Sequence, residues 1–432
     1  MGFVGLLFIV YLFYMEPGGY NVMDVAKGRA FYIFSACFVV AIACTYFLQC
    51  AGVRQGFFYN VPFTPPATSA TTAIVIVSVT WVSALLSDYW PRTLLGVNGV
   101  DGAITISLYL LIFVIVSHFG KVAEALYYLI GVVLILFCSI CIVQMYDLNV
   151  FYFYQGGTVY SDYLSTEMNG QFLSTIGNSN LVAIFLATMT AMLLIALHKM
   201  TSQGRWLLIT PIVMSLIVLC KIWVLLGLVG LIGSLYITVP VLVNRRYRKL
   251  VVLLQALLLL AALIALYFTS NAPGVFGEVH QLLHRKVDLS FGSSRLYIWS
   301  NLLQDMRGNW LLGHGPDSVV AANVEPFAYV SQLTGEVSFR IFTDAHNAYL
   351  NILYNTGLLG LLPYLFLLAR TTYYWVRLAQ HNVHVAALGA GIACWAIASF
   401  FCISHYIVEP FFWCLLGLFE SEVRRSKEGN LM

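Results

Sequence analysis

The sequence has few charged residues. Asp, Glu, Lys and Arg make up 9% of its 432 residues, whereas a soluble domain usually carries about 25%. Hydrophobic residues make up 60%, and they recur in apolar runs of about 20 residues. This composition excludes an ordinary soluble domain and predicts an all-α polytopic membrane protein. A transmembrane β-barrel would show short alternating segments instead.

Cysteine is absent from the longest polar segment, Ser270–Asn347. All nine cysteines lie in or at the ends of apolar runs, which excludes a disulfide framework. Cys138 and Cys141 form a C-x-x-C inside such a run, and we expect them to pack there. The first apolar run has no basic n-region, so it predicts a retained helix. No internal repeat is visible, which disfavours an inverted-repeat transporter.

The apolar runs predict about twelve membrane helices. Their expected spans are Gly2–Met15, Ala30–Leu48, Ala67–Leu86, Ala103–Val116, Val122–Val143, Leu181–Leu197, Trp206–Cys220, Ile222–Val243, Leu250–Phe268, Ala348–Leu368, Val385–Ser404 and Tyr406–Phe419. Residues 1–269 would form an N-terminal bundle of about nine helices. Residues 270–347 would form a large outer loop, and residues 348–432 the C-terminal helices with a short cytoplasmic tail.

Basic residues predict the orientation of these helices. With the N-terminus in the cytoplasm, the cytoplasmic segments hold most of them, including Arg245, Arg246, Arg248, Lys249, Arg424, Arg425 and Lys427. The short outer segments hold only Lys27, Arg29, Arg92 and Lys221. This asymmetry places the large loop outside.

Within the outer loop, Ser293–Met306 is expected to form an amphipathic helix. Trp299, Leu302, Leu303 and Met306 fall on one apolar face, and Ser293 or Ser294 would cap it. Such a helix would lie flat on the membrane, with Trp299 at the level of the lipid headgroups.

The outer segments also hold cations suited to an anion. Arg295 falls in the first turn of the expected surface helix, where free N–H groups and a guanidinium fork suit a phosphate. Lys221 lies at the outer boundary between two apolar runs, and Arg340 lies in the large loop. The alternative for Arg295 is snorkelling to headgroups, and for Lys221 an interfacial anchor.

His346 precedes the tenth predicted span, which Asp344 or Asn347 could cap. A helix N-terminus disfavours imidazolium, so His346 should stay neutral and able to accept a proton; the alternative is a histidine that only caps the helix. His314, in a glycine-rich turn, is expected to be structural. Asp317, Asp344 and His346 have no ligand spacing, so we expect a site without metal or other cofactor.

Anion clamps and a neutral histidine at the outer side suit a lipid-diphosphate-linked sugar. Arginine and lysine can neutralise a diphosphate leaving group, and His346 is the candidate base for an acceptor hydroxyl.

Four blocks in this order resemble the bacterial O-antigen ligase and polymerase superfamily. They are Ser294–Trp299, Leu311–Asp317, Asp344–Leu350 and Gly357–Gly360, supported by Ser87–Gly102 and Gly177–Asn180. The resemblance implies a multi-pass glycosyltransferase at the outer face of the bacterial cytoplasmic membrane. It implies an inverting, metal-independent transfer from an undecaprenyl-diphosphate-type donor to a glycan or lipid A core acceptor, among membrane lipids and with no nucleic acid.

The resemblance also implies roles for single residues. The histidine of the His-Asn block, His346, would be catalytic, and Arg295, followed by Trp299, would contact the diphosphate. Lys221 stands where relatives often carry arginine, and Ser179 stands where they carry proline. A polymerase of the same superfamily uses the same chemistry and stays open. A transporter would need polar residues strung through the bundle, and the sequence has few.

Overall fold

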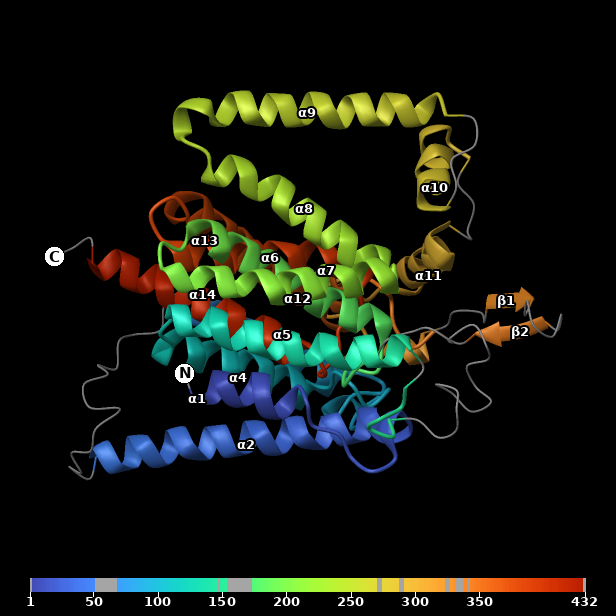
Figure 1. The fold of residues 1–432 in the computed structure, drawn as a ribbon. Coiled ribbons are helices and arrows are strands. Elements are labelled where there is room, and N and C mark those ends of the chain that lie inside the picture. Colours follow the sequence, from blue (N-terminus) through green and yellow to red (C-terminus); the bar gives the residue numbers. More distant parts are fainter. Residues whose placement is uncertain are drawn as a thin grey trace.

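The computed structural model describes residues 2–50, 68–146, 148–153, 173–269, 274–286, 291–322, 327–330, 337–340 and 342–429. The long helices run roughly side by side, and both termini lie at one end of the bundle (Figure 1). The helices of the N-terminal part are α1 (Gly2–Leu6, continued by a π-helical turn Leu7–Tyr11), α2 (Met23–Cys50), α3 (Thr68–Leu86), α4 (Ala103–Phe119), α5 (Glu124–Met145), α6 (Ser179–Lys199), α7 (Ile209–Ile222), α8 (Leu225–Leu242) and α9 (Arg245–Tyr267).

The remaining elements are α10 (Gly274–Leu283), α11 (Phe291–Asp305), β1 (Phe327–Val330), β2 (Val337–Arg340), α12 (Ala348–Leu378), α13 (Val383–Ala398) and α14 (Glu409–Gly429). Short 3₁₀ turns cover Gly19–Val22, Arg92–Leu94, Gln203–Leu208, Val319–Ala321 and Ser399–Phe401. The structure is therefore helical apart from one antiparallel hairpin, in which Phe327 pairs with Arg340. This short hairpin is the one described element outside the expected all-α class.

Nine helices of the described chain are long and apolar enough to cross a membrane. Two shorter apolar helices, Gly2–Tyr11 and α4, and the partly charged α14 occupy the other three predicted spans. The multi-pass membrane class is therefore confirmed, with nine rather than twelve helices meeting the length and polarity criteria.

The core lies where α6, α13 and α14 pack. α6 contacts α8 and α13, while α14 contacts α4 and α13. Between Phe411 and Phe419 the α14 side chains are buried, so this helix runs through the centre even though its last turns are charged. α9 is the opposite case: it contacts α8 and α10 and buries none of its residues, so its leucines are available to lipid.

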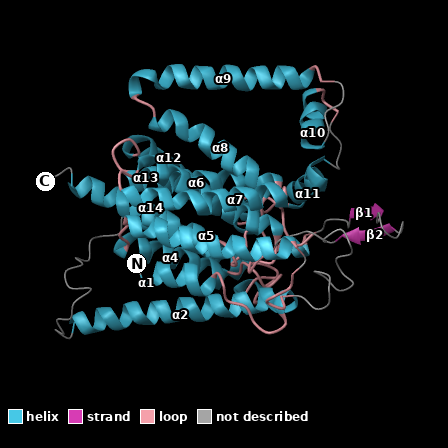
Figure 2. Cartoon of the chain, viewed as in Figure 1, coloured by secondary structure: helices cyan, strands magenta, loops and turns pink. Residues whose placement is uncertain are grey.

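Loops and short elements gather at the end of the bundle away from the termini (Figure 2). α10, α11 and the hairpin lie at this end, which we name the loop end. The segments before α4, α6 and α12 and between α13 and α14 also belong to it, because these helices begin or end there. The opposite end, with the C-terminus, holds the Arg370–Glu420 ion pair and the Arg424 contact with the His118 carbonyl.

Candidate functional site

A break in α12 builds the frame of the site. At Gly357 the backbone leaves the helix (φ 65°, ψ −168°), and this frees the carbonyls of Tyr354 and Asn355. They accept hydrogen bonds from the N–H groups of His314 (2.9 Å) and Gly315 (2.9 Å). Ser83 and Ser87 at the end of α3 donate to the Leu312 and His314 carbonyls at 2.7 and 2.5 Å. The segment before Asp317 is thereby locked between α3 and α12.

Replacing Gly357 with alanine is expected to lower the stability of the protein. A Cβ at Gly357 would stand 2.2 Å from the Leu311 carbonyl oxygen, and the backbone conformation there is one that only glycine adopts easily. We expect a loss of at least about 2 kcal/mol, seen as a lower unfolding temperature of the purified protein in detergent. Gly5→Ala in α1 is the matched control, because the nearest non-local atom to a Cβ there is 4.0 Å away. Equal unfolding temperatures for the two variants would contradict the close packing of Leu311 against the break in α12.

The surface helix is confirmed as α11, beginning two residues earlier than predicted. Gly292 and Ser294 have positive φ, so the first turn is irregular and regular helix begins beside Arg295. Its apolar face is not laid on lipid. Ile298, Leu302 and Met306 are buried against Val319, Ala345, Leu350 and Tyr354, while Leu303 is 41% exposed. The chain itself therefore covers the face expected to lie on lipid, and Trp299 is half-buried against it.

Trp299 joins α11 to the residue before His346. Its indole N–H donates to the Ala345 carbonyl at 2.9 Å, and its ring meets Phe400 edge-on at 5.7 Å. One helical turn earlier, Arg295 lies on the same face and donates to the Phe401 carbonyl at 3.3 Å. Its guanidinium also lies 5.8 Å from the centre of the Phe401 ring. α11, the start of α12 and the Ser399–Phe401 turn therefore meet around Trp299.

Arg295 is half-buried at this junction. Burial lowers the pKa of its guanidinium, while the nearby Glu278 opposes that shift. An arginine remains charged under these conditions. A permanent cation in a partly water-excluded position attracts an anion more strongly than one in bulk water.

His346 is held in a strained conformation at the start of α12. Its φ is 48°, a left-handed value that non-glycine residues adopt rarely and that clusters at functional positions. The Asp344 carboxylate accepts the His346 N–H at 2.6 Å. Asn347 is the helix cap, since its side chain accepts the N–H groups of Tyr349 and Leu350 at 3.0 and 3.1 Å. His346 thus lies beside the positive end of a helix dipole, half-buried.

Asp317 and His314 connect the segment around them to the residues before α4 and to α12. The Asp317 carboxylate accepts the Asn98 and Val100 N–H groups, each at 3.0 Å. Burial raises the pKa of Asp317 to about 7, against the effect of these backbone donors, and raises that of Asp344 to about 8. His314 stacks on Tyr354 with ring centroids 4.4 Å apart and contacts the Asn309 amide at 3.0 Å. Asp317 therefore has the contacts expected of a structural group, whereas the buried Nδ1 of His314 has no hydrogen-bond partner among the described residues.

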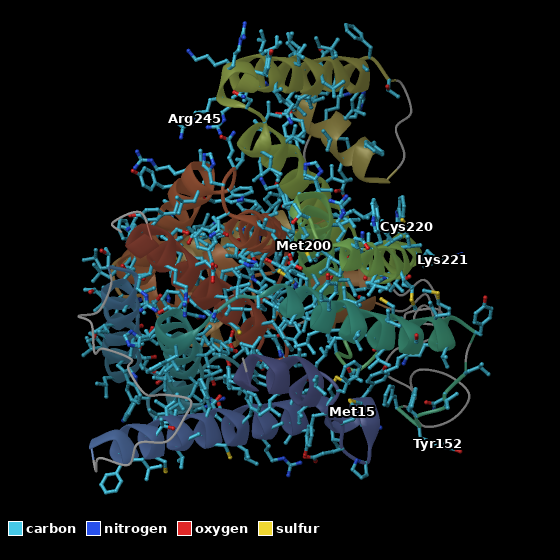
Figure 3. The ribbon with its side chains drawn as sticks, turned by 60° about the vertical axis from the view of Figure 1, so that its left-hand side comes forward. Met15, Tyr152, Met200, Cys220, Lys221 and Arg245 are labelled. Carbon is cyan, nitrogen blue, oxygen red and sulfur yellow. The ribbon has the colours of Figure 1, made fainter. Side chains whose placement is uncertain are left out.

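No described contact links Lys221 or Arg340, the other two cations expected to bind the diphosphate, to Trp299. Lys221 is exposed in the last turn of α7, a helix that contacts α5 and α6. It lies at the loop end, far from Arg245 at the other end (Figure 3). Arg340 is the last residue of β2, and its side chain lies outside the described part of the structure.

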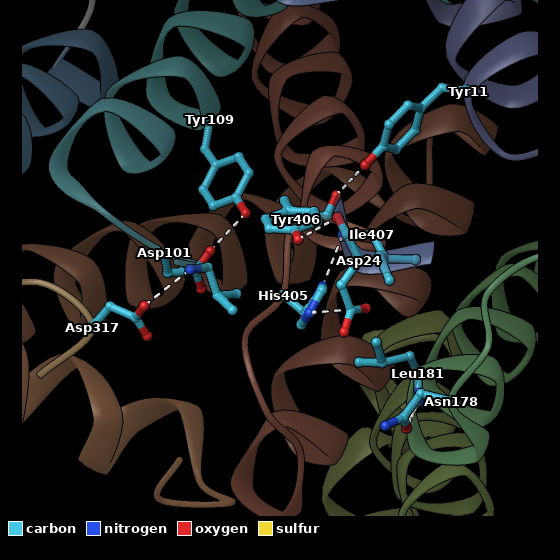
Figure 4. Close-up of polar contacts among 11 residues, drawn as sticks. Tyr11, Asp24, Asp101, Tyr109, Asn178, Leu181, Asp317, His405, Tyr406 and Ile407 are labelled. Atoms are coloured by element: carbon cyan, nitrogen blue, oxygen red, sulfur yellow. Dashed lines mark hydrogen bonds and ion pairs between the residues drawn. The ribbon is translucent and has the colours of Figure 1, made fainter. Parts of the chain in front are cut away.

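The segment between α13 and α14 is the part of this region that sequence reasoning missed. It supplies Phe400 and Phe401 to the junction with α11. It then carries His405 and Tyr406 toward Asp24 of α2 (Figure 4). The buried Asp101 faces it from the start of α4 and accepts a hydrogen bond from Tyr109 at 2.8 Å. A usable signal was present, because polar residues such as His405 and Glu409 interrupt an otherwise apolar stretch.

No group of three or more metal-binding side chains occurs among the described residues. His280, in the last turn of α10, and His284, the first residue after this helix, have the spacing of a metal-binding pair. In the structure His284 instead stacks between His280 and Tyr267, with centroid distances of 4.2 and 4.3 Å. This stack joins α10 to the end of α9.

Comparison with known proteins agrees with this architecture. Residues 172–365 match the family model described as O-antigen ligase. The matched segment runs from the residues before α6 to the first half of α12, and so includes Lys221, Arg295, Trp299 and His346. A search of curated proteins found no match. Residues 172–365, somewhat less than half of the chain, are therefore similar to the O-antigen ligase family, and the described part of the chain has the apolar helices of a multi-pass membrane protein.

Proposed function

We propose that this protein is an O-antigen-ligase-like glycosyltransferase that moves a polyprenyl-diphosphate-linked glycan onto an acceptor hydroxyl. The observation that carries the proposal is the junction around Trp299. There the half-buried Arg295 and Trp299 lie one turn apart on α11, and the Trp299 indole donates to the carbonyl of Ala345, the residue before the strained His346. A cation for the leaving group and a base for the nucleophile are the two groups that this transfer requires.

In the proposed reaction His346 removes the proton of the acceptor hydroxyl. The oxygen attacks the anomeric carbon from the face opposite the diphosphate, a new glycosidic bond forms, and the bond to the diphosphate oxygen breaks. The electron pair leaves with the diphosphate, and the configuration at the anomeric carbon inverts. The position of His346 at a helix N-terminus supports a neutral imidazole that is ready to accept the proton.

Arg295 is proposed to hold the departing diphosphate. A guanidinium in a partly buried site stabilises the charge that develops on the leaving oxygen, which is the role a metal ion plays in other transferases. Lys221 and Arg340 are proposed as further cations for the same anion, and Trp299 as the residue that orients Arg295 with respect to His346. Asp344 and Asn347 fix the backbone of His346, while His314 and Asp317 support the frame beneath it.

The proposed topology has twelve membrane helices, a cytoplasmic N-terminus and the loop end outside the cytoplasmic membrane. Residues 1–269, 270–347 and 348–432 are the proposed N-terminal bundle, outer segment and C-terminal helices. The distribution of charge supports this orientation. Lys199, Arg370, Arg424 and Arg425 lie at the end opposite the loop end, where positive residues favour the cytoplasm. The proposed donor is an undecaprenyl-diphosphate-linked glycan, and the acceptor a glycan or lipid A core.

Deletion of the gene tests the proposed function through the glycans that accumulate. Loss of a ligase is expected to leave long chains on the lipid carrier and none attached to the acceptor. Loss of a polymerase would leave single repeat units attached, and loss of a transporter would leave lipid-linked glycan on the cytoplasmic side. Transfer by the purified protein in lipid nanodiscs, without other proteins, is the direct confirmation.

Lys221→Arg is expected to retain or increase transfer. An arginine keeps the charge and adds a bidentate fork that matches a phosphate. The measurement is the KM for the lipid-linked donor in nanodiscs, with Lys199→Arg at the opposite end as control. An inactive but folded Lys221→Arg protein would show that the lysine has a role other than supplying charge.

A further inference from the structure

His405 lies in a part of the loop end that the transfer chemistry above does not use. Two hydrogen bonds fix its neighbourhood. Tyr11 donates to the Tyr406 carbonyl at 2.6 Å, and the Tyr406 hydroxyl donates to the Asp24 carbonyl at 2.5 Å. The segment before α14 is thereby tied to α1 and α2 (Figure 4). A rigid backbone of this kind can hold a functional side chain in one orientation.

The imidazole of His405 is oriented by its own backbone. Its Nδ1 accepts the Ile407 N–H at 3.3 Å, so in the neutral ring the proton is on Nε2. Burial lowers the pKa of His405, which favours this neutral form, although Asp24 and Asp101 oppose the shift. Nε2 points toward Asp24 and stands 3.8 Å from its carboxylate oxygen.

That separation is too long for a direct hydrogen bond. In the described structure no other hydrogen bond reaches the His405 Nε2. The His405 side chain is 11% exposed and that of Asp24 is 75% exposed. A buried donor and an open acceptor therefore face each other with a gap that one oxygen atom can bridge.

The hydrogen-bonding properties of His405 Nε2 and the Asp24 carboxylate determine which group can lie between them. The bridging atom must accept from Nε2–H and donate to the carboxylate at the same time. A phosphate diester has no proton to donate and would meet the negative charge of Asp24, and a cation would meet the N–H of His405. A hydroxyl oxygen, of a sugar or of water, satisfies both partners.

The position of the pair connects it to the transfer site. His405 is the fourth residue after Phe401, whose carbonyl holds Arg295. Four residues of extended chain span at most about 14 Å. A glycan whose diphosphate is at Arg295, or an acceptor beside it, would therefore pass close to His405.

We propose that Asp24 and His405 form a sugar-binding pair that takes one hydroxyl group of a glycan substrate between the carboxylate and Nε2. The pair positions the glycan and does not touch the reacting atoms. This inference rests on the proposed glycosyl transfer for its substrate class. It adds α2 and the segment before α14, both outside the matched residues 172–365, to the substrate-binding surface.

The test uses Asp24→Ala and His405→Phe in the full-length protein, reconstituted in nanodiscs. Asp24 is exposed, so its replacement is not expected to affect folding, and phenylalanine keeps the ring shape of His405. Losing a hydrogen bond to a charged group should raise the KM for one of the two glycan substrates about tenfold to a hundredfold, with kcat nearly unchanged. Asp88→Ala, another exposed aspartate of the loop end, is the control and should leave both constants unchanged.

A binding measurement separates this inference from the proposed function. Saturation-transfer NMR with soluble oligosaccharides cut from the lipid-linked glycan of the source cells requires no turnover. We expect a signal with the wild-type protein and with His346→Ala, and its loss in Asp24→Ala and His405→Phe. Oligosaccharide binding of this pattern without any transfer would refute the glycosyltransferase proposal and leave the sugar-binding pair intact. Unchanged KM values and unchanged NMR signals in both folded variants would overturn the pair.

Discussion

Replacing His346 with alanine is expected to reduce transfer by about 10²- to 10⁴-fold, the contribution of a general base. The loss should fall on kcat, because the imidazole acts on the acceptor proton in the transition state and not in holding the glycan. The measurement is the initial rate of transfer from a lipid-linked donor in nanodiscs. In cells, the same change should remove the glycan from its acceptor while the protein still inserts in the membrane.

The left-handed backbone at His346 calls for a second variant. Alanine is strained at a φ of 48°, whereas asparagine tolerates this conformation. His346→Asn should therefore lose the same activity with a smaller change in unfolding temperature. His198→Ala, in the last turn of α6 at the opposite end, is the matched histidine control and should transfer normally. Normal glycan display by His346→Asn would reject the assignment of the base.

Arg295→Ala is expected to lower kcat/KM for the lipid-linked donor by about 2–4 kcal/mol, the scale for losing one preorganised charge stabiliser. This corresponds to a loss of about 30- to 1000-fold. The reason is the partly buried position of the guanidinium beside Phe401, where its charge is less screened than at the surface. Steady-state kinetics over a range of donor concentrations gives the value.

Two further substitutions separate charge from geometry at this position. Arg295→Lys keeps a positive charge and loses the fork, so it should recover only part of the activity. Arg307→Ala removes an exposed arginine just beyond the end of the same helix and should leave the kinetics unchanged. Unchanged donor kinetics in folded Arg295→Ala would move the diphosphate site to another part of the molecule.

Much of the helical fold was predictable from the sequence because lipid imposes strict rules on a spanning segment. Apolar runs located the long helices, although α2 begins seven residues before the predicted span and α12 and α14 each end ten residues after it. Local capping was equally readable: the Asn178 side chain accepts the N–H groups of Asn180 and Leu181 to start α6, and Asn347 starts α12 in the same way. Ser179, which stands at the first helical position, leaves this start intact.

Other features depend on contacts between segments that are distant in the sequence. The spacing of residue types along the chain does not reveal such contacts. The apolar face of α11 fits lipid and protein equally well by composition. Only the position of Ala345 and Tyr354 shows that protein covers it. The break at Gly357 and the path from Phe401 to His405 are likewise set by tertiary packing. Sequence reasoning therefore proposed Arg295, Trp299 and His346 one at a time, and missed the segment between α13 and α14, which contacts Arg295 and Trp299.

A cryo-electron microscopy structure of the full-length protein with bound undecaprenyl diphosphate tests the central claim most directly. The account predicts the diphosphate in hydrogen-bonding contact with the Arg295 guanidinium, beside Phe401, with the His346 imidazole facing the position of the glycan. A diphosphate bound at the opposite end of the bundle, or at the loop end without contact to Arg295 and with His346 turned away, would contradict it.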